Sequence, residues 1–500
     1  MTVGEEQRTT PSPTPPPVPG VGPLVVGAAL GGVLGVVVFW LMHRTLGDDA
    51  LISVSYARTL AESGTWGVSP GLTSNTQTGP LNVWLLALGV LVVGHPIAVV
   101  GVLLCACLAA SGWLATDVAR RLGLHPAGGW LVVTLLATSP VLVATVGLET
   151  QVAVVVLLGV LAAALSGRVV TTGVLCGLAV LARPDLVVPA GVLALLLLDA
   201  GGLPPGRRAR GLATVAATAV VVALPWHVWA WFGLGGAVPD TTWVRTADTS
   251  GPQVLEAVPV WVQAYPFAAV ASILPVLLAL GCAVHAVRHR AHRWARVVLL
   301  LVVAGGIHLL ALEGIRAQGA SWYFGPVVAC AATAVGLTAA SARRSVPVLG
   351  IGLVGVVAIA GVALSGPLPW TWAPLVANLA RTEQYAGVAR ELPALTGGEP
   401  VRGPGELGAL SYYGPVPVLD FLSEPALTDE VLHRRAADGG FRSRLIAWSA
   451  AHRQVSAPIP TRWQLTYGSV PAGARAVRSW YVDTPLAGAT TLILSERGGS

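Results

Sequence analysis

The chain has 500 residues, of which 54% are hydrophobic and only 11% are charged, and its mean hydropathy is +0.71. In soluble domains roughly a quarter of all residues are charged, so this composition excludes an ordinary soluble protein and indicates a polytopic membrane protein. The formal net charge of +6 does not indicate nucleic-acid binding, because the arginines form short clusters between apolar runs, as orientation signals do. The five cysteines lie within apolar segments without metal-ligand spacing to histidine, so we expect them to be core residues.

Residues 1–21 are rich in proline and polar residues, and we expect them to form a disordered cytoplasmic tail. The apolar run from Gly22 to Met42 is long enough to span a bilayer, which requires roughly 20 residues. It lacks a small-residue cleavage site, so we predict a retained membrane helix rather than a signal peptide.

The number of spans depends on the apolar segment 80–94, whose 15 residues suit an interfacial helix better than a full span. If this segment lies along the outer face, the later arginine clusters all fall on the cytoplasmic side, whereas a full crossing would place Arg120 and Arg121 outside. We therefore predict about eleven spans, a cytoplasmic N-terminus and an extracytoplasmic C-terminus. The predicted spans are 22–42, 96–116, 129–146, 150–165, 169–182, 185–200, 211–233, 264–286, 297–312, 319–341 and 346–366.

The predicted fold is an all-α polytopic membrane domain over residues 22–366, followed by a small extracytoplasmic α/β domain over residues 367–500. The second part has regular polar content and apolar stretches such as 490–494, and a segment of this length can support one core. We expect it to pack over the membrane site, either contributing to acceptor binding or acting as a structural cap.

Two adjacent carboxylates, Asp48 and Asp49, directly follow the first apolar run, where a membrane helix must leave the bilayer. Charges at a membrane edge are expensive and tend to be kept where they bind an ion, hold a substrate or move a proton. The predicted topology places the pair on the outer face together with Glu149 and Asp240. The alternative interpretation is structural, because aspartate is a good N-cap and acidic residues favour the first turn of a helix.

Short sequence strings resemble those of a known enzyme family, in the same order and on the expected faces of the membrane. They are GDDALIS at Gly47–Ser53, TGPL at Thr78–Leu81, GLET at Gly147–Thr150, LARPD at Leu181–Asp185, PDT at Pro239–Thr241, GELGALSYY at Gly405–Tyr413 and VLD at Val418–Asp420. The chain after residue 22 thereby resembles polyprenyl-phosphate-sugar-dependent glycosyltransferases of the GT-C fold. Within that family it most resembles the actinobacterial terminal β-arabinofuranosyltransferase type.

This resemblance implies an enzyme that moves a sugar, plausibly arabinofuranose, from a polyprenyl phosphate donor to a cell-envelope glycan on the outer face of the plasma membrane. Inverting transfer needs a general base to take the acceptor hydroxyl proton, while the phosphate leaves without a strong acid. The resemblance implies that Asp48 is this base and that Asp49 assists, orients the acceptor or binds a divalent cation. Asp49 and Glu149 together are candidate ligands for Mg, Mn or Ca, and no other cofactor is expected.

Further candidates for substrate binding are distributed along the outer face. Arg58, Arg183 and Arg316 are candidate ligands of the donor phosphate, because guanidinium groups bind phosphate oxygens in a bidentate manner. Lipid headgroup anchoring is the alternative for Arg58 and Arg183, and Arg316 can instead pair with Glu313 one turn away. His227, Asp240 and Glu149 complete the set. An interfacial histidine is more often structural, and Glu149 can simply complement the dipole of the helix that it precedes.

Two other functions remain open. A transporter or flippase of a lipid-linked substrate would place polar residues at the bilayer midplane in broken, repeated helices. Here no clear repeat is visible, and the acidic residues gather at one membrane edge. A noncatalytic envelope assembly protein would keep the fold and tolerate loss of the aspartate pair. Neither alternative involves nucleic acid.

Overall fold

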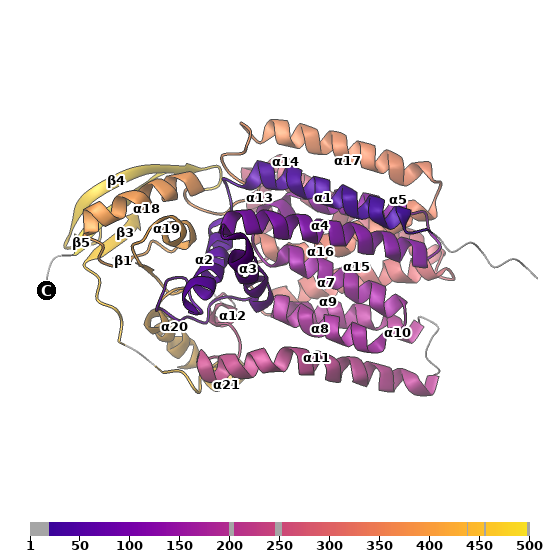
Figure 1. Ribbon diagram of the computed structural model, residues 1–500, viewed down its shortest axis with the longest axis horizontal. Coiled ribbons are helices and arrows are strands. Elements are labelled where there is room, and N and C mark those ends of the chain that lie inside the picture. Colours follow the sequence, from indigo (N-terminus) through magenta and orange to yellow (C-terminus); the bar gives the residue numbers. More distant parts are fainter. Residues whose placement is uncertain (1–19, 200–204, 246–252, 438, 455–456, 498–500) are drawn as a thin grey trace, which may run out of the picture.

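The computed structural model describes residues 20–199, 205–245, 253–437, 439–454 and 457–497. The predicted N-terminal tail over 1–21 thus lies almost entirely outside the described residues. In the described part, most of the chain between residues 21 and 364 forms apolar helices that run side by side in Figure 1.

Seven helical stretches of the described residues are long and apolar enough to cross a membrane, judged by length and composition. They are α1 (Gly22–Met42), α4 (Pro96–Arg121), α11 (Pro205–Gly233), α14 (Pro266–Arg288), α15 (Arg293–Gly314), η2 (Ser321–Phe324) with α16 (Gly325–Ser341), and α17 (Ser345–Leu364). Each of these stretches matches a predicted span. The protein is therefore membrane-embedded, and its orientation in the membrane stays a prediction.

The other four predicted spans fall on shorter or interrupted helices. These are α5 (Ala127–Thr138) with α6 (Pro140–Ala144), α7 (Thr150–Leu165), α8 (Val169–Ala182), and η1 (Pro184–Leu186) with α9 (Val187–Ala194) and α10 (Leu196–Asp199). Pro140 and Pro184 begin new helices at two of these breaks, because proline lacks the N–H that would continue the helix. The predicted count of about eleven full spans is thus supported by helix length for only seven stretches.

Four short helices lie where the bundle meets the C-terminal part of the chain (Figure 1). They are α2 (Asp48–Ser63), α3 (Pro80–Val93), α12 (Asp240–Val244) and α13 (Ala257–Ala264). The apolar segment 80–94 forms α3, a separate helix of 14 residues that ends at Gly94 in a left-handed conformation. Its shortness agrees with the predicted interfacial helix.

The C-terminal region, residues 367–497, combines helices with a five-stranded sheet of order β2-β1-β3-β5-β4. The strands are β1 (Val401–Arg402), β2 (Val418–Leu419), β3 (Trp463–Tyr467), β4 (Ala474–Thr484) and β5 (Gly488–Arg497), and the helices are α18 (Thr382–Thr396), α19 (Gly408–Tyr413), α20 (Pro425–Ala437) and α21 (Gly440–Ser449). β1 pairs in parallel with β2 and β3, whereas β5 pairs antiparallel with β3 and β4. Alternate residues of β5, Leu492 and Leu494, are fully buried, as period-two alternation predicts.

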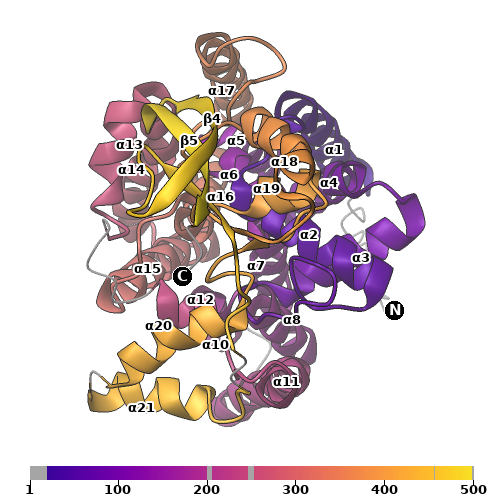
Figure 2. The ribbon, with the colours of Figure 1, turned by 90° about the vertical axis from the view of Figure 1, so that its left-hand side faces the viewer.

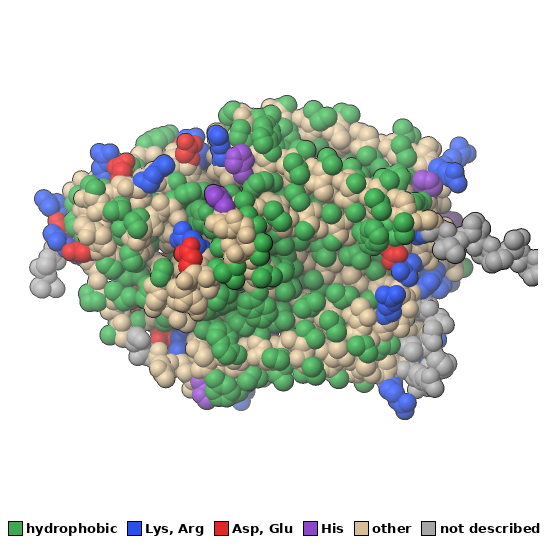
Figure 3. Space-filling model, in the orientation of Figure 1, with side chains coloured by type: hydrophobic (Ala, Val, Ile, Leu, Met, Phe, Trp, Pro, Cys, Tyr) green, Lys and Arg blue, Asp and Glu red, His purple; other side chains and the backbone are tan. Residues whose placement is uncertain are grey.

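One hydrophobic core cluster continues from the bundle into the C-terminal region, from Leu51 of α2 to Leu410 of α19 and Leu494 of β5. Seen from the end that carries this region, α18, α19 and the sheet cover the ends of the bundle helices (Figure 2). The space-filling view shows charged side chains at the two ends of the molecule and a broad apolar band between them (Figure 3). The C-terminal region is therefore packed directly on one end of the membrane-embedded bundle.

Candidate active site

Helix α2 carries the aspartate pair in its first turn and lies between the bundle and the C-terminal region. It begins after Gly47, which has an extended backbone, and it ends at Gly64, which has a left-handed conformation with φ of 70°. Successive residues of an α-helix point about 100° apart, so Asp48 and Asp49 cannot face the same surroundings. Asp48 faces the C-terminal region, and Asp49 faces a cavity.

Asp48 binds the beginning of α19. Its Oδ2 accepts hydrogen bonds from the backbone N–H groups of Leu407 at 3.0 Å and Gly408 at 2.9 Å, and its Oδ1 accepts one from Ala409 at 2.8 Å. The side chain is buried, and this burial raises the pKa of Asp48 to about 6 although the three N–H groups oppose the change. A Cβ at Gly408 would lie 1.9 Å from the Asp48 carbonyl oxygen, so only glycine permits this approach.

Arg58 binds the other end of α19. Its Nη1 donates to the Tyr412 carbonyl oxygen at 3.0 Å, and its Nη2 donates to the Ser411 carbonyl oxygen at 3.2 Å. The guanidinium also lies over the Tyr412 ring, 5.1 Å from its centroid. Asp48 and Arg58 together thus hold both ends of α19 against α2. We call these two side chains the α19 clamp.

Asp49 lines a cavity that encloses about 870 Å³ including its open mouth. Its Oδ1 lies 3.1 Å from Nη2 of Arg245, which comes from the residue directly after α12. Both side chains are accessible, with 33% of Asp49 and 22% of Arg245 exposed. The Arg245 guanidinium also lies over the Trp322 ring at 5.1 Å, which holds it at the cavity wall. Asp49 is thus the member of the pair that an incoming molecule can reach.

Glu149 and Arg183 form a buried ion pair that lines the same cavity. Nη1 of Arg183 lies 3.3 Å from Oε1 of Glu149, and its Nη2 and Nε contact the two carboxylate oxygens of Asp185 at 2.8 and 3.0 Å. Arg183 also donates to the Trp322 carbonyl oxygen at 3.3 Å and lies over the Tyr323 ring. Oε2 of Glu149, in contrast, is buried and has no hydrogen-bond partner. Four of the five N–H donors of Arg183 thus have partners, whereas Glu149 keeps one acceptor oxygen without a hydrogen bond.

The remaining polar wall of the cavity comes from the loop before α3. Gln77 donates to the Ser53 hydroxyl at 2.9 Å, and the Thr76 hydroxyl donates to the Leu422 carbonyl oxygen at 2.6 Å. The Tyr56 hydroxyl lies 2.8 Å from the Thr76 hydroxyl and fixes this loop to α2. These contacts order a row of side chains able to hydrogen-bond sugar hydroxyls.

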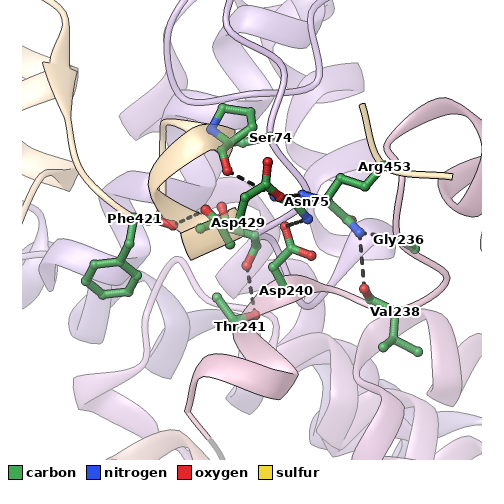
Figure 4. A network of polar contacts seen from close by, with 12 residues as sticks. Ser74, Asn75, Gly236, Val238, Asp240, Thr241, Phe421, Asp429 and Arg453 are labelled. Carbon is green, nitrogen blue, oxygen red and sulfur yellow. Dashed lines mark hydrogen bonds and ion pairs between the residues drawn. The ribbon is translucent and has the colours of Figure 1, made fainter. Parts of the chain in front are cut away.

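Asp240 lies behind the cavity in the buried polar network drawn in Figure 4. Its Oδ2 lies 2.7 Å from Nη1 of Arg453, which also pairs with Asp429, and its backbone N–H donates to the Asn75 carbonyl oxygen at 2.7 Å. The Thr241 hydroxyl donates to the Thr76 carbonyl oxygen at 3.0 Å. Burial raises the pKa of Asp240 to about 6, with Arg453 opposing the rise. This network holds α12 beside the Thr76 loop and so places Arg245 at the cavity.

Of the predicted site residues, the structure brings Asp49, Glu149 and Arg183 together at the cavity. Asp48, Arg58 and Asp240 lie next to it and bind other parts of the chain. His227 uses its Nδ1 to contact the Ala237 carbonyl oxygen at 2.8 Å, away from the cavity lining. Arg316 is exposed in a left-handed conformation with φ of 54°, and it is also not among the lining residues.

The cation prediction concerned Asp49 and Glu149. Across the described ranges, no three His, Cys, Asp or Glu residues are grouped so that they could hold a metal ion. Asp49 and Glu149 each contact an arginine instead. The divalent-cation site at Asp49 and Glu149 therefore stays a prediction, and no step of the chemistry below uses a metal.

Arg245, Asp185 and Trp322 line the cavity and were not among the sequence-based candidates. Asp185 is the last residue of the LARPD string and binds the arginine two positions before it. Arg245 follows Asp240 by five positions in a short polar stretch, but its partner Asp49 is 196 residues away in the sequence. Only the fold reveals that these two charges meet.

Comparisons with known proteins show the fold. No family model matches the sequence, and no curated protein matches it. Among solved structures, ArnT from Cupriavidus metallidurans bound to undecaprenyl phosphate superposes with a TM-score of 0.54 at 15% identity, covering 95% of this chain and 98% of that chain. The apo state of ArnT gives a TM-score of 0.56 at the same identity and coverage. The predicted GT-C fold is therefore confirmed as an ArnT-like fold, and the arabinofuranosyltransferase type stays a prediction.

Proposed function

We propose that this protein is a membrane glycosyltransferase that transfers a sugar from a polyprenyl phosphate donor to a cell-envelope glycan at the outer face of the membrane. The observation that carries the proposal is the accessible pair of Asp49 and Arg245 in one cavity, at the end of an ArnT-like bundle. The pair provides a carboxylate for an acceptor hydroxyl and a guanidinium for a phosphate. The ArnT structure with undecaprenyl phosphate supports a lipid phosphate of this kind as the donor carrier.

In the proposed reaction, Asp49 is the general base. The acceptor hydroxyl gives its proton to the Asp49 carboxylate while its oxygen forms a bond to the anomeric carbon of the donor sugar. The bond between that carbon and the phosphate oxygen breaks, and its electron pair leaves on the polyprenyl phosphate. Attack from the face opposite the leaving phosphate inverts the anomeric configuration. We choose Asp49 over Asp48, because three backbone N–H groups already occupy the Asp48 carboxylate.

Arg245 is the proposed ligand of the donor phosphate. Without a donor, its guanidinium pairs with Asp49, and this pairing favours the charged form of the carboxylate. When the phosphate arrives, it provides a second anion for the same guanidinium. Arg245 can then stabilise the growing charge on the leaving phosphate while Asp49 receives the proton. Because Arg245 stacks on Trp322, its guanidinium stays at the cavity wall and needs to move only a little to exchange Asp49 for the phosphate.

Glu149 and Arg183 are proposed to hold the sugar rather than the phosphate. Arg183 is neutralised by Glu149 and Asp185, so it has little charge left for a second anion. The free Oε2 of Glu149 is a buried acceptor that a sugar hydroxyl can satisfy. Arabinofuranose is our first choice of sugar, since the sequence most resembles the arabinofuranosyltransferase type.

The test is a transfer assay with the full-length protein, a polyprenyl-phosphate arabinofuranose donor and a cell-envelope glycan acceptor. Release of polyprenyl phosphate and labelling of the glycan are measured together, and the Asp49→Asn variant is the negative control. A panel of other polyprenyl-phosphate sugars identifies the donor if arabinofuranose is not transferred. Movement of the lipid-linked sugar across proteoliposomes without any transfer would instead establish a flippase. Absence of transfer and of donor binding with the whole panel would favour a noncatalytic assembly protein.

A further inference from the structure

Helix α21 carries an exposed apolar stripe that the proposed reaction does not use. Phe441 is 71% exposed, Leu445 36% and Trp448 54%. Their spacing of four and three residues places them on one face of the helix. The opposite face is buried and consists of Ser443, Ile446 and Ser449. The three large apolar side chains of α21 thus remain exposed among the described residues.

The stripe continues the outward-facing surface of a membrane-spanning helix. The Trp448 ring packs against Trp231 of α11 with centroids 4.8 Å apart, and Nε1 of Trp231 donates to the Trp448 carbonyl oxygen at 3.2 Å. In the same part of α11, Phe232 is 60% exposed and Val228 is 42% exposed. Because α11 is apolar and long enough to span the membrane, this exposed side faces lipid. The lipid-facing surface thus passes from α11 to α21 without a break.

The orientation of α21 suits the surface of a bilayer. In Figure 2, which looks along the bundle helices, α11 is seen end-on, whereas α21 is seen from the side at the edge of the molecule. α21 therefore lies across the direction of the spans, at the level where α11 ends. Amphipathic helices that lie in the membrane interface adopt this arrangement, with their apolar face among the acyl chains.

The charge of this segment suits phospholipid headgroups. Helix α21 contains two arginines, Arg442 and Arg444, and no aspartate or glutamate. Arg444 is exposed and lies next to the stripe, three residues after Phe441 and four before Trp448. A long arginine side chain in this position can keep its stem on the apolar face and extend its guanidinium to the phosphates.

We propose that α21 docks into the membrane interface, with Phe441, Leu445 and Trp448 among the acyl chains and Arg444 on the phosphates of anionic phospholipids. This docking is independent of the transfer reaction and would hold the C-terminal region on the bilayer. The occupant of the stripe is lipid rather than another protein, because the stripe adjoins the exposed apolar side of a helix that is long and apolar enough to span a membrane.

The test places a fluorescent bimane label at single added cysteines in the full-length protein, reconstituted in bilayers. Leu445→Cys reports on the centre of the stripe. Ala447→Cys is the matched control, since Ala447 is exposed on the same helix but lies outside the stripe. The protein without added cysteines is labelled in parallel to subtract the signal of the native thiols. We expect lipid-borne nitroxide to quench the label at position 445 several-fold more than at 447, and aqueous iodide to show the reverse order.

Equal iodide quenching at both positions, in variants that keep the thermal midpoint of the parent, would overturn the docking. Shielding of position 445 in native membranes but not in bilayers of purified lipid would also overturn it, because a protein would then cover the stripe.

The preference for anionic phospholipids is measured separately. Replacing phosphatidylglycerol by phosphatidylcholine should increase iodide quenching at position 445, and Arg444→Gln should remove most of this lipid dependence. An equal dependence in the Arg444→Gln variant would contradict the role of the guanidinium.

Discussion

Asp48 and Asp49 are neighbours in the sequence, but the two faces of α2 give them different surroundings. Asp48 is 6% exposed and accepts three backbone hydrogen bonds from the first residues of α19. Asp49 has 33% of its side chain exposed in a cavity and contacts one arginine. A carboxylate whose lone pairs are occupied by the fold cannot readily take a proton from a substrate. One aspartate thus attaches the C-terminal region, and the other is available for chemistry.

Replacing the cavity aspartate should have the largest effect on activity. In the Asp49→Asn variant, the acceptor proton has no base, so we expect kcat for sugar transfer to fall about a thousandfold, as losses of general bases typically do. Because the Asp49 side chain is accessible and makes one ion pair, the thermal midpoint should change little. Transfer kinetics and thermal unfolding of the same preparation measure both effects.

The neighbouring aspartate, Asp48, provides the control for the Asp49→Asn variant. Asp48→Asn changes the neighbouring residue by the same few atoms but should leave a much larger fraction of kcat in the molecules that stay folded. If Asp49→Asn keeps full activity while Asp48→Asn loses it, the assignment of the base to Asp49 is wrong. The sequence-based prediction of Asp48 as the base would then be restored.

The second prediction concerns the α19 clamp. In Asp48→Asn, the amide NH₂ must face at least one of the N–H groups of Leu407, Gly408 and Ala409, leaving buried donors without an acceptor. We expect the free energy of unfolding to fall by about 3 kcal/mol. Faster proteolysis of the C-terminal region and a lower thermal midpoint would measure this loss. Arg58→Gln should show the same changes to a smaller extent, since it removes hydrogen bonds to two carbonyl groups at the C-terminal end of α19.

These two aspartates also show what the sequence could predict. The start of α2 and the apolar spans follow from local patterns, such as an acidic first turn after a run like Gly22–Met42. The choice between Asp48 and Asp49 depends on contacts with residues about 360 positions later, which no local pattern contains. Arg58 is similar, because its contacts with Ser411 and Tyr412, which make it part of the clamp, join residues more than 350 positions apart.

Helix lengths were predictable only in part, because the packing of the bundle tolerates breaks within apolar segments. Hydropathy identifies apolar segments, but Pro140 interrupts the predicted span 129–146 inside the bundle, where neighbouring helices cover the broken ends. Arg183 was recognised from its short motif, yet its neutralisation by two carboxylates required the packing of α7 against α8. The sequence thus identified residues that lie at the cavity, whereas the contacts that each of them makes depend on the fold.

The third prediction separates donor binding from proton transfer within the cavity. Arg245→Gln removes the proposed phosphate ligand but leaves the Asp49 carboxylate in place. We expect KM for the polyprenyl-phosphate sugar to rise about tenfold, with a smaller decrease in kcat, because most of the lost contact is present before the reaction. Arg245→Lys keeps the charge without the bidentate geometry, so its KM for the donor should lie between that of the parent and that of Arg245→Gln. An unchanged KM for the donor in Arg245→Gln would exclude this residue as the phosphate ligand.

The smallest expected effect is a pH dependence on the clamp side of α2. Glu406 accepts the Leu379 N–H at 3.0 Å, and burial together with the nearby Asp48 raises the pKa of Glu406 to about 8. A carboxyl whose pKa is higher in the folded state binds its proton more tightly there, so stability is lost as the pH rises through that value. Between pH 7 and 9 we expect the free energy of unfolding to fall by about 1 kcal/mol.

Glu406→Gln tests this pH dependence directly, because glutamine keeps an acceptor for the Leu379 N–H but cannot ionise. The thermal midpoint of this variant should stay level between pH 7 and 9, where that of the parent falls. Asp49→Asn is the matched control and should fall in parallel with the parent, since Asp49 lies on the other face of α2. If the Glu406→Gln variant retains the full slope, ionisation of Glu406 does not govern how firmly the C-terminal region is attached. The difference between the two faces of α2 would then rest on hydrogen bonding alone.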